Sequence, residues 1–235
     1  MGVYLKQFEN HTHYESFTVD TENFITPNVS LCVQENEVHY NPYVDPYNGH
    51  AYVDLDLPSG TKWAKYNVGA NSETDYGLYF SWGNIEGHKK ASGYDFSKST
   101  YSSTSGNRYN RVSVNISANS DYDAARVNMG GKWRMPTKDE FQELYDNTDS
   151  KWTHINDVYG YMFMKKTDHS VYVFFPAAGY YNGTGHNYNG SYGYYWSSVL
   201  YSTESAYSLR FSSAIYTQEN KYRYYGSSVR GVIDK

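Results

Sequence analysis

Short segments in which apolar and polar residues alternate recur along this chain and predict β-strands. Residues 28–33 and 206–211 alternate with period two, as strands with one buried face do. Residues 171–175 are apolar without alternation, which predicts a strand covered on both faces at the centre of its sheet. A Pro-Ser-Gly turn separates two more predicted strands, at 52–55 and 62–64.

Two helices are predicted by their capping residues. Ser120 can cap a helix over residues 121–129, which has acidic residues in its first turn and two glycines beyond its last. Thr137 and Glu140 stand at capping-box spacing ahead of an apolar stripe that begins at Phe141. Strands and helices together predict a compact α+β domain.

The chain divides into an N-terminal extension, residues 1–50, and one domain, residues 51–235. The extension holds the strand at 28–33, which residues 37–40 can join as a hairpin, and a predicted helical turn at 14–17. Its prolines and Asn-Gly favour extended and turn backbone toward its end. We interpret it as a docking segment and linker.

Charge and cysteine content exclude several kinds of protein. The formal net charge is −5 and the basic residues form no stripe, which excludes a phosphate-dominated nucleic-acid surface. Cys32 is the only cysteine, so there is no intrachain disulfide and no cysteine-rich zinc site. No apolar run approaches the ~20 residues of a membrane helix, and no signal peptide is visible, so we expect no membrane insertion.

Tyrosine is concentrated near the C-terminus, where 12 of the chain's 29 tyrosines lie within residues 180–225. A core favours side chains that have no hydroxyl to satisfy, and few Leu, Ile or Val accompany these tyrosines. Tyr, Ser, Asn and Gly are the residues of an adaptable binding surface. A tyrosine-rich sheet surface without a binding role is the alternative interpretation.

A series of short motifs covers the domain, at residues 53–55, 57–64, 67–70, 79–83, 133–137, 176–180, 195–198 and 228–230. In this order they resemble the C-type-lectin-like domains of the Fibrobacter major paralogous family. The resemblance implies an α+β fold of the C-type-lectin-like kind, a small twisted antiparallel sheet with two helices and long loops. Four tryptophans lie in these motifs and are therefore expected in the core: Trp63, Trp82, Trp133 and Trp196.

The segment of about residues 180–225 is similar to the variable region of diversity-generating retroelement proteins, the class that includes phage tropism determinants. In that class, randomised template adenines convert Asn codons into Tyr, Ser, His, Asp and Thr codons. The resemblance implies that the ligand-binding, variable positions are Tyr181, Asn182, His186, Asn187, Tyr188, Tyr192, Tyr194, Tyr201, Ser202, Tyr222, Tyr224 and Tyr225. We expect the tyrosines among them to face solvent on one contiguous surface, where substitutions change stability little.

No metal or cofactor is predicted. The chain lacks the Glu-Pro-Asn and Trp-Asn-Asp motifs of calcium-binding lectins. Asp54 and Asp56 beside a turn are interpreted as solvated carboxylates, and the pair of His11 and His13 has no evident third ligand.

No enzymatic activity is predicted either. The formylglycine-generating branch of the lectin-like fold needs reactive cysteines, and Cys32 stands alone outside the matching motifs. Glu140 and Glu143 are interpreted as charges on a helix surface rather than as the carboxylate pair of a glycosidase.

The sequence thus predicts a non-catalytic receptor-binding protein with a diversified tyrosine-rich face, encoded by a phage or prophage of gut bacteria and located on a virion tail or cell surface. Its expected partners are a protein or glycan receptor on a cell and, through the N-terminal segment, other virion or surface proteins. Two alternatives remain: a bacterial adhesin-tip or structural protein without diversification, and a carbohydrate-binding lectin.

Overall fold

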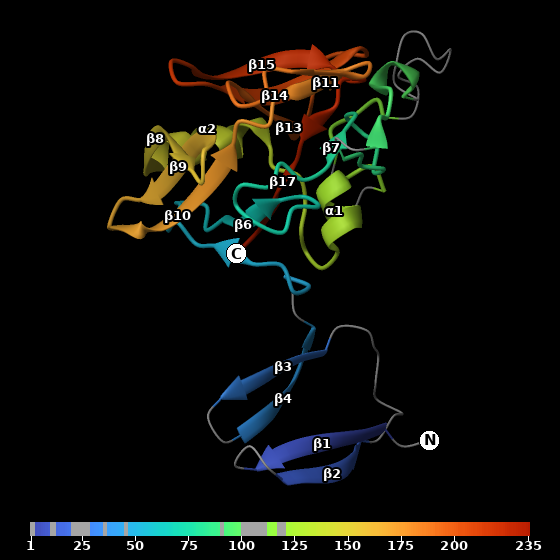
Figure 1. Cartoon of the computed structure of the whole chain (residues 1–235), viewed down its shortest axis with the longest axis vertical. Coiled ribbons are helices and arrows are strands. Elements are labelled where there is room, and N and C mark those ends of the chain that lie inside the picture. The colour runs from blue at the N-terminus through green and yellow to red at the C-terminus, as the bar shows by residue number, and fades with distance from the viewer. Residues whose placement is uncertain are drawn as a thin grey trace. The chain divides into compact units, whose positions relative to one another are not determined.

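The computed structural model describes residues 3–9, 13–19, 29–34, 37–44, 47–89, 92–99, 112–116 and 121–235. The chain forms two compact units, Met1–Gly49 and His50–Lys235, and Figure 1 shows the elements of each.

The first unit contains two antiparallel hairpins. β1 (Val3–Glu9) pairs with β2 (His13–Val19), and β3 (Val29–Gln34) pairs with β4 (Glu37–Val44). The predicted hairpin of these last two segments is confirmed from Val29 onward. The predicted helical turn at 14–17 is wrong, because these residues lie within β2, where alternating Tyr, Ser and Phe suit a strand.

The second unit consists mainly of strands in small sheets. The largest sheet has the order β15-β14-β13-β16-β7 and is formed by β7 (Tyr79–Phe80), β13 (Gly193–Leu200), β14 (Ser205–Phe211), β15 (Tyr216–Tyr222) and β16 (Ser227–Ser228). A sheet of order β10-β9-β8 is formed by β8 (Thr148–Ile155), β9 (Val158–Lys165) and β10 (Asp168–Pro176). Another, of order β17-β6-β5, is formed by β5 (Tyr52–Val53), β6 (Lys62–Asn67) and β17 (Arg230–Ile233). A small hairpin joins β11 (Tyr180–Asn182) to β12 (Gly185–Asn187).

The predicted α+β C-type-lectin-like fold is wrong. Strands account for 43% of the structure and are divided among several small sheets rather than collected in one. The described residues contain two α-helices, α1 (Ala124–Met129) and α2 (Lys138–Asn147), and the 3-10 helix η3 (Phe96–Lys98). Residues 148–165, for which no element was predicted, pair as β8 and β9 over their whole length. The second unit is therefore a mostly-β fold.

Helix α1 begins later than predicted. Its N-cap is Asp123, whose carboxylate accepts hydrogen bonds from the backbone N–H of Arg126 at 2.9 Å and of Met135 at 2.9 Å. Ser120, the predicted cap, lies outside the described residues. Burial raises the pKa of Asp123 to about 6, although these backbone hydrogen bonds favour its charged form.

Helix α2 is confirmed together with its cap. Thr137 and Glu140 form a capping box, in which each side chain accepts a hydrogen bond from the backbone N–H of the other. Phe141 and Leu144 on the buried side of the helix enter the main hydrophobic core. The helix contacts strands of both the β13–β15 sheet and the β8–β10 sheet, so it joins the two.

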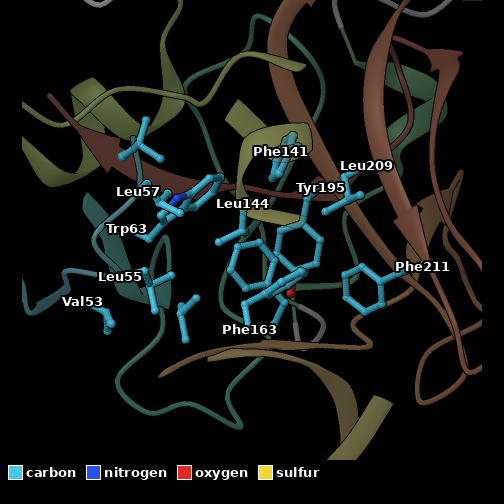
Figure 2. Packing of buried hydrophobic residues seen from close by; sticks show 13 residues of the cluster. Val53, Leu55, Leu57, Trp63, Phe141, Leu144, Phe163, Tyr195, Leu209 and Phe211 are labelled. Carbon is cyan, nitrogen blue, oxygen red and sulfur yellow. The ribbon is translucent and has the colours of Figure 1, made fainter. Parts of the chain in front are cut away.

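Six of the thirteen buried side chains in the main core are aromatic. The ring of Trp63 lies 5.4 Å from that of Phe141 and 5.6 Å from that of Phe175, and Tyr195 stacks on Phe211 at 5.7 Å. Figure 2 shows these side chains converging from strands and from α2. The predicted burial of four tryptophans is confirmed, since each has 0% exposure: Trp63, Trp82, Trp133 and Trp196.

Strand β10 lies at the edge of its sheet, so the central position predicted for residues 171–175 is wrong. The last part of its apolar run, Val173 to Phe175, is buried nonetheless, and β10 packs against β6 and β5 of another sheet. Side chains reach the backbone carbonyls of its last residues. Arg230 Nη2 donates to the carbonyl of Phe174 at 2.7 Å, and the hydroxyl of Tyr195 donates to the carbonyl of Pro176 at 2.8 Å. These bonds satisfy two carbonyls that a neighbouring strand would otherwise bind.

Candidate binding face

The sheet of β13, β14 and β15 has one face toward the main core, and its opposite face is covered in part, since Trp196 there has 0% exposure. Tyr195 and Leu209 are paired across the strands and belong to the core. Successive side chains of a strand alternate between faces, so the neighbouring pair, Tyr194 and Arg210, lies on the opposite face. Lys221 of β15 shares this face with them.

The ammonium group of Lys221 lies among tyrosine rings. Its Nζ is 3.6 Å from the ring centroid of Tyr180, 3.9 Å from that of Tyr194 and 5.2 Å from that of Tyr225. Lys221 is 8% exposed, and its Nζ is 3.7 Å from a carboxylate oxygen of Glu219. Burial lowers the pKa of Lys221 to about 8, and Glu219 opposes this shift. Because ring faces attract a cation, the charged lysine holds the three rings together.

Arg210 extends this arrangement along the sheet. Its guanidinium carbon lies 4.9 Å above the ring of Tyr192, and its Nη1 donates to Glu219 at 3.2 Å. Glu219 therefore interacts with both cations of the outer face, which balances part of their charge.

Seven tyrosines form one continuous group of rings beside Lys221 and Arg210, here named the outer tyrosine cluster. Neighbouring rings are in contact with centroid separations of 4.7 to 6.2 Å. The members are Tyr180, Tyr188, Tyr192, Tyr194, Tyr222, Tyr224 and Tyr225. Six of them are among the predicted variable positions.

The expected solvent exposure holds for part of the cluster only. Tyr188 and Tyr222 are 56% and 48% exposed. Tyr194 is buried, at 4%, because it lies on the sheet itself beneath Tyr180 and Lys221. The prediction that Tyr194 faces solvent is therefore wrong, and this residue supports the more exposed rings from below.

Tyr181 is also buried, at 6%, so its predicted exposure is wrong too. It follows Tyr180 on β11 and points to the other side, into a second aromatic cluster with Tyr79 and Phe96. The ring of His186 stacks on Tyr181 at 4.4 Å, and its Nε2 lies 2.8 Å from the carbonyl of Ala178. Tyr181 and His186 thus contribute to packing beneath the β11–β12 hairpin.

The remaining predicted positions lie beside the cluster rather than in it. Tyr201 is 53% exposed, and its ring contacts Tyr207 at 5.2 Å. The hydroxyl of Ser202 lies 2.8 Å from that of Ser205 in the turn before β14. Asn182 is exposed at the end of β11, and Asn187 is half-buried at the end of β12.

Sequence reasoning missed four residues of the face. Tyr180 ends the motif at 176–180, which was interpreted as framework. Arg210, Glu219 and Lys221 belong to no motif. The sequence does contain a pattern that could have identified Glu219 and Lys221. They are two residues apart, so both side chains lie on one face once β15 is recognised as a strand.

Gly179 holds the β11–β12 hairpin close to β13. It has φ +64°, and a Cβ there would lie 2.2 Å from the carbonyl oxygen of Asn187, whereas Gly190 has φ +80° and open space. A residue other than glycine in this backbone conformation costs roughly 1–3 kcal/mol, and at Gly179 the close contact adds to this cost. Gly179→Ala is therefore expected to lower the free energy of unfolding by about 2 kcal/mol or more. Gly190→Ala, which creates no such contact, should lower it by less. Denaturant unfolding measures both variants, and equal losses would contradict the close approach.

Lys221 should make stability depend on pH. Its pKa of about 8 in the folded state is below the ordinary 10.5, so between these values the folded state binds fewer protons and the free energy of unfolding rises with pH. We expect the free energy of unfolding of the native chain to rise by up to about 3 kcal/mol over this pH range. Lys221→Met, which has no ammonium group, should not show this rise. Urea unfolding of both proteins at several pH values measures the difference. Parallel curves would show that the lysine is not desolvated.

No group of three His, Cys, Asp or Glu side chains is arranged to hold a metal ion in the part of the chain that the structure describes. Asp54 and Asp56 each face a lysine, with Nζ of Lys62 at 3.8 Å and Nζ of Lys165 at 2.5 Å. His11 lies outside the described residues. Among the described helices, none has the length and apolar character needed to cross a membrane.

Residues 143–232 match a protein family described as a domain of unknown function (DUF8237). The matched stretch contains β13, β14 and β15 and all seven members of the outer tyrosine cluster. No curated protein and no solved structure matches the chain.

Proposed function

We propose that this chain is a non-catalytic recognition protein that binds a protein or glycan receptor through the outer tyrosine cluster. The observation that carries this proposal is the continuity of seven tyrosine rings on the side of the β13–β15 sheet that faces away from the core.

The chemistry of the cluster suits contact with a macromolecule. Tyrosine rings bury a large area while losing few rotamers, and their hydroxyls bond to either donors or acceptors. Lys221 and Arg210 lie against the rings of Tyr194 and Tyr192. These contacts fix the rings before a ligand arrives, which reduces the entropy lost on binding.

The separation between the face and the core supports a second part of the proposal, that the exposed members vary through a diversity-generating retroelement. Tyr188 and Tyr222 are exposed, so we expect them to tolerate replacement, whereas Tyr195 belongs to the core. An adenine-rich template repeat and a reverse transcriptase beside the gene are expected. Their absence would favour an adhesin without diversification.

The same proposal places the protein on a phage virion or a cell surface. Two compact units support it: the first, with its two hairpins, is available for attachment, while the second carries the binding face.

Arrays of purified glycans and of purified cell-surface proteins test the binding role. The double variant Tyr188→Ser, Tyr222→Ser is expected to bind its ligand at least about 30-fold more weakly than the native chain, since each aromatic anchor contributes more than about 1 kcal/mol. Its melting temperature should stay unchanged. The control is Tyr52→Ser, Tyr159→Ser, which removes two tyrosines of similar exposure, 41% and 47%, from outside the cluster. Equal binding by both double variants would contradict the proposal.

A further inference from the structure

A hollow of about 350 Å³ lies at the edge of the outer tyrosine cluster, beside the last residues of β15. Its walls include Glu204, Glu219, Asn220, Lys221, Tyr222 and Tyr225, and it is here named the edge hollow. Its volume is at the lower end of the range of about 300–1,000 Å³ for ligand pockets, so it has room for one small ring rather than for an extended molecule.

The backbone around the edge hollow is held in place before any ligand binds. In the turn that precedes β14, Ser202 N donates to the carbonyl of Ser205 at 2.9 Å, and the hydroxyl of Ser202 accepts from Glu204 N at 3.2 Å. Arg223, with 0% exposure, donates from its Nη1 to the carbonyl of Thr203 at 3.1 Å and from its backbone N to that of Glu204 at 3.0 Å. Glu204 is therefore carried by a rigid turn.

The charges of the edge hollow are nearly balanced. The carboxylate of Glu219 is 3.7 Å from Lys221 Nζ and 3.2 Å from Arg210 Nη1, so it is already paired with two cations. The charged residues that line the hollow are Glu204, Glu219 and Lys221, and Arg210 pairs with Glu219 from outside the lining. The hollow therefore carries a small negative charge, which disfavours an anionic ligand.

The hydrogen-bonding groups are mixed. Carboxylates of Glu204 and Glu219 accept, the ammonium of Lys221 donates, and the amide of Asn220 does both. Lys221 is more than nine-tenths buried yet lines the hollow, and its ammonium has three N–H donors. One of them faces Glu219, 3.7 Å away, and a ligand oxygen can accept from another. A ligand with adjacent hydroxyl groups can bond to both the donors and the acceptors of the hollow, because each hydroxyl donates and accepts.

The aromatic walls add a flat apolar surface. Tyr222 is 48% exposed, and its ring meets that of Tyr225 edge to face at 5.8 Å. The ring of Tyr224 stacks on one face of Tyr222 at 5.7 Å. The other face of Tyr222 can meet the C–H groups of a ligand, and polar groups of the hollow lie near its rim. A neutral ring that has hydroxyls at its edge and C–H groups on one face matches both properties.

We propose that the edge hollow binds a neutral pyranose residue of a glycan. The inference rests on the proposed function and deepens it, because the hollow shares Tyr222, Tyr225 and Lys221 with the outer tyrosine cluster. The sugar ring stacks on Tyr222, its hydroxyls donate to Glu204 and Glu219, and Lys221 donates to one of its oxygens. The rest of the glycan extends over the exposed tyrosines.

Saturation-transfer NMR of the full chain with the methyl glycosides of glucose, galactose, mannose and N-acetylglucosamine tests the inference. At least one of these is expected to bind saturably. Tyr222→Ala and Glu204→Gln should each weaken that binding by about tenfold or more. The matched controls are Tyr159→Ala, a tyrosine of equal exposure on β9, and Glu86→Gln, an exposed carboxylate in the loop after β7, and both should leave it unchanged.

Three outcomes overturn the inference: none of the glycosides binds, binding survives Tyr222→Ala and Glu204→Gln, or the controls weaken it equally. Binding of a surface protein that depends on Tyr188, together with no glycoside binding, overturns the sugar assignment and leaves the proposed function in place. Because Tyr222 and Glu204 are exposed, we expect both variants to fold, and the melting temperature of each confirms this.

Discussion

Arg230→Met is expected to lower the free energy of unfolding by about 3–5 kcal/mol, because several buried acceptors lose their donor at once. Arg230 has 0% exposure and donates to the side-chain oxygen of Asn67 at 2.9 Å and to the carbonyls of Ala64 at 3.0 Å, Lys65 at 2.6 Å and Phe174 at 2.7 Å. Methionine leaves these buried acceptors without donors, each at a cost of about 1–3 kcal/mol if no water reaches it.

The partners of Arg230 explain why its loss affects the whole second unit. It lies on β17 and bonds to β6 and to β10, so one side chain ties strands of two sheets together. Burial lowers its pKa to about 10, while Tyr195 favours the charged form. The arginine is thus protonated at neutral pH, with backbone and amide oxygens as its hydrogen-bond acceptors.

Urea unfolding measures the free energy of unfolding of Arg230→Met. The control is Arg126→Met, which removes a partly exposed arginine on α1. We expect the control to lose no more than about 1 kcal/mol, as for a partly exposed position. Arg230→Lys should be intermediate, because an ammonium has fewer donors than the planar guanidinium. Equal losses for Arg230→Met and Arg126→Met would contradict the role given to the buried arginine.

Trp196→Ala is expected to lower the free energy of unfolding by about 3–5 kcal/mol, the range for a large aromatic side chain lost from a core. Trp196 has 0% exposure, and its Nε1 donates to the carbonyl of Phe80 at 2.7 Å. Two residues after Tyr194 on β13, it lies on the same face of the sheet as Tyr194. The side chain fills volume on that face and also links β13 to β7.

Thermal unfolding followed by circular dichroism measures Trp196→Ala, with Trp196→Phe as a second variant. Phenylalanine restores much of the volume but not the indole donor, so its smaller loss separates the hydrogen bond from the cavity. Tyr159→Ala, which removes an exposed ring, serves as the control. A native melting temperature in Trp196→Ala would contradict the burial of this side chain.

Features with a local cause could be predicted from the sequence. The capping box of Thr137 and Glu140 depends on residues three apart, and α2 begins where it predicts. The alternation at 206–211 corresponds to β14, with Leu209 and Phe211 in the core. Both patterns depend only on residues within one turn of a helix or within one strand.

Features that depend on distant pairing could not be predicted. Nothing within residues 171–175 distinguishes a strand flanked by two neighbours from one whose edge is covered by Arg230. The division into several small sheets likewise depends on which strands meet, and this made the fold class wrong. Motifs can resemble those of a family without fixing how the strands are assembled.

The candidate site shows the same limit. Residue type alone selected Tyr188, Tyr222 and Tyr181 together, yet the alternation of β11 sends Tyr181 inward beside Tyr79. The same alternation brings Tyr180 into the outer cluster. Deciding which tyrosine faces outward requires the strand register in addition to the composition.

The central claim is that the outer tyrosine cluster is a binding face whose sequence can change without loss of the fold. The most direct measurement is the fraction of folded members, scored by protease resistance on yeast, in a library that mixes Tyr, Ser, Asn, Asp and His at Tyr188, Tyr192, Tyr222 and Tyr224. The library is then selected for binding to purified lysozyme. The account predicts that most members resist protease and that binders emerge, whereas a matched library at Tyr79, Tyr181 and Tyr195, all buried, loses resistance. Equal loss of resistance in the two libraries, or no binders from the first, would contradict it.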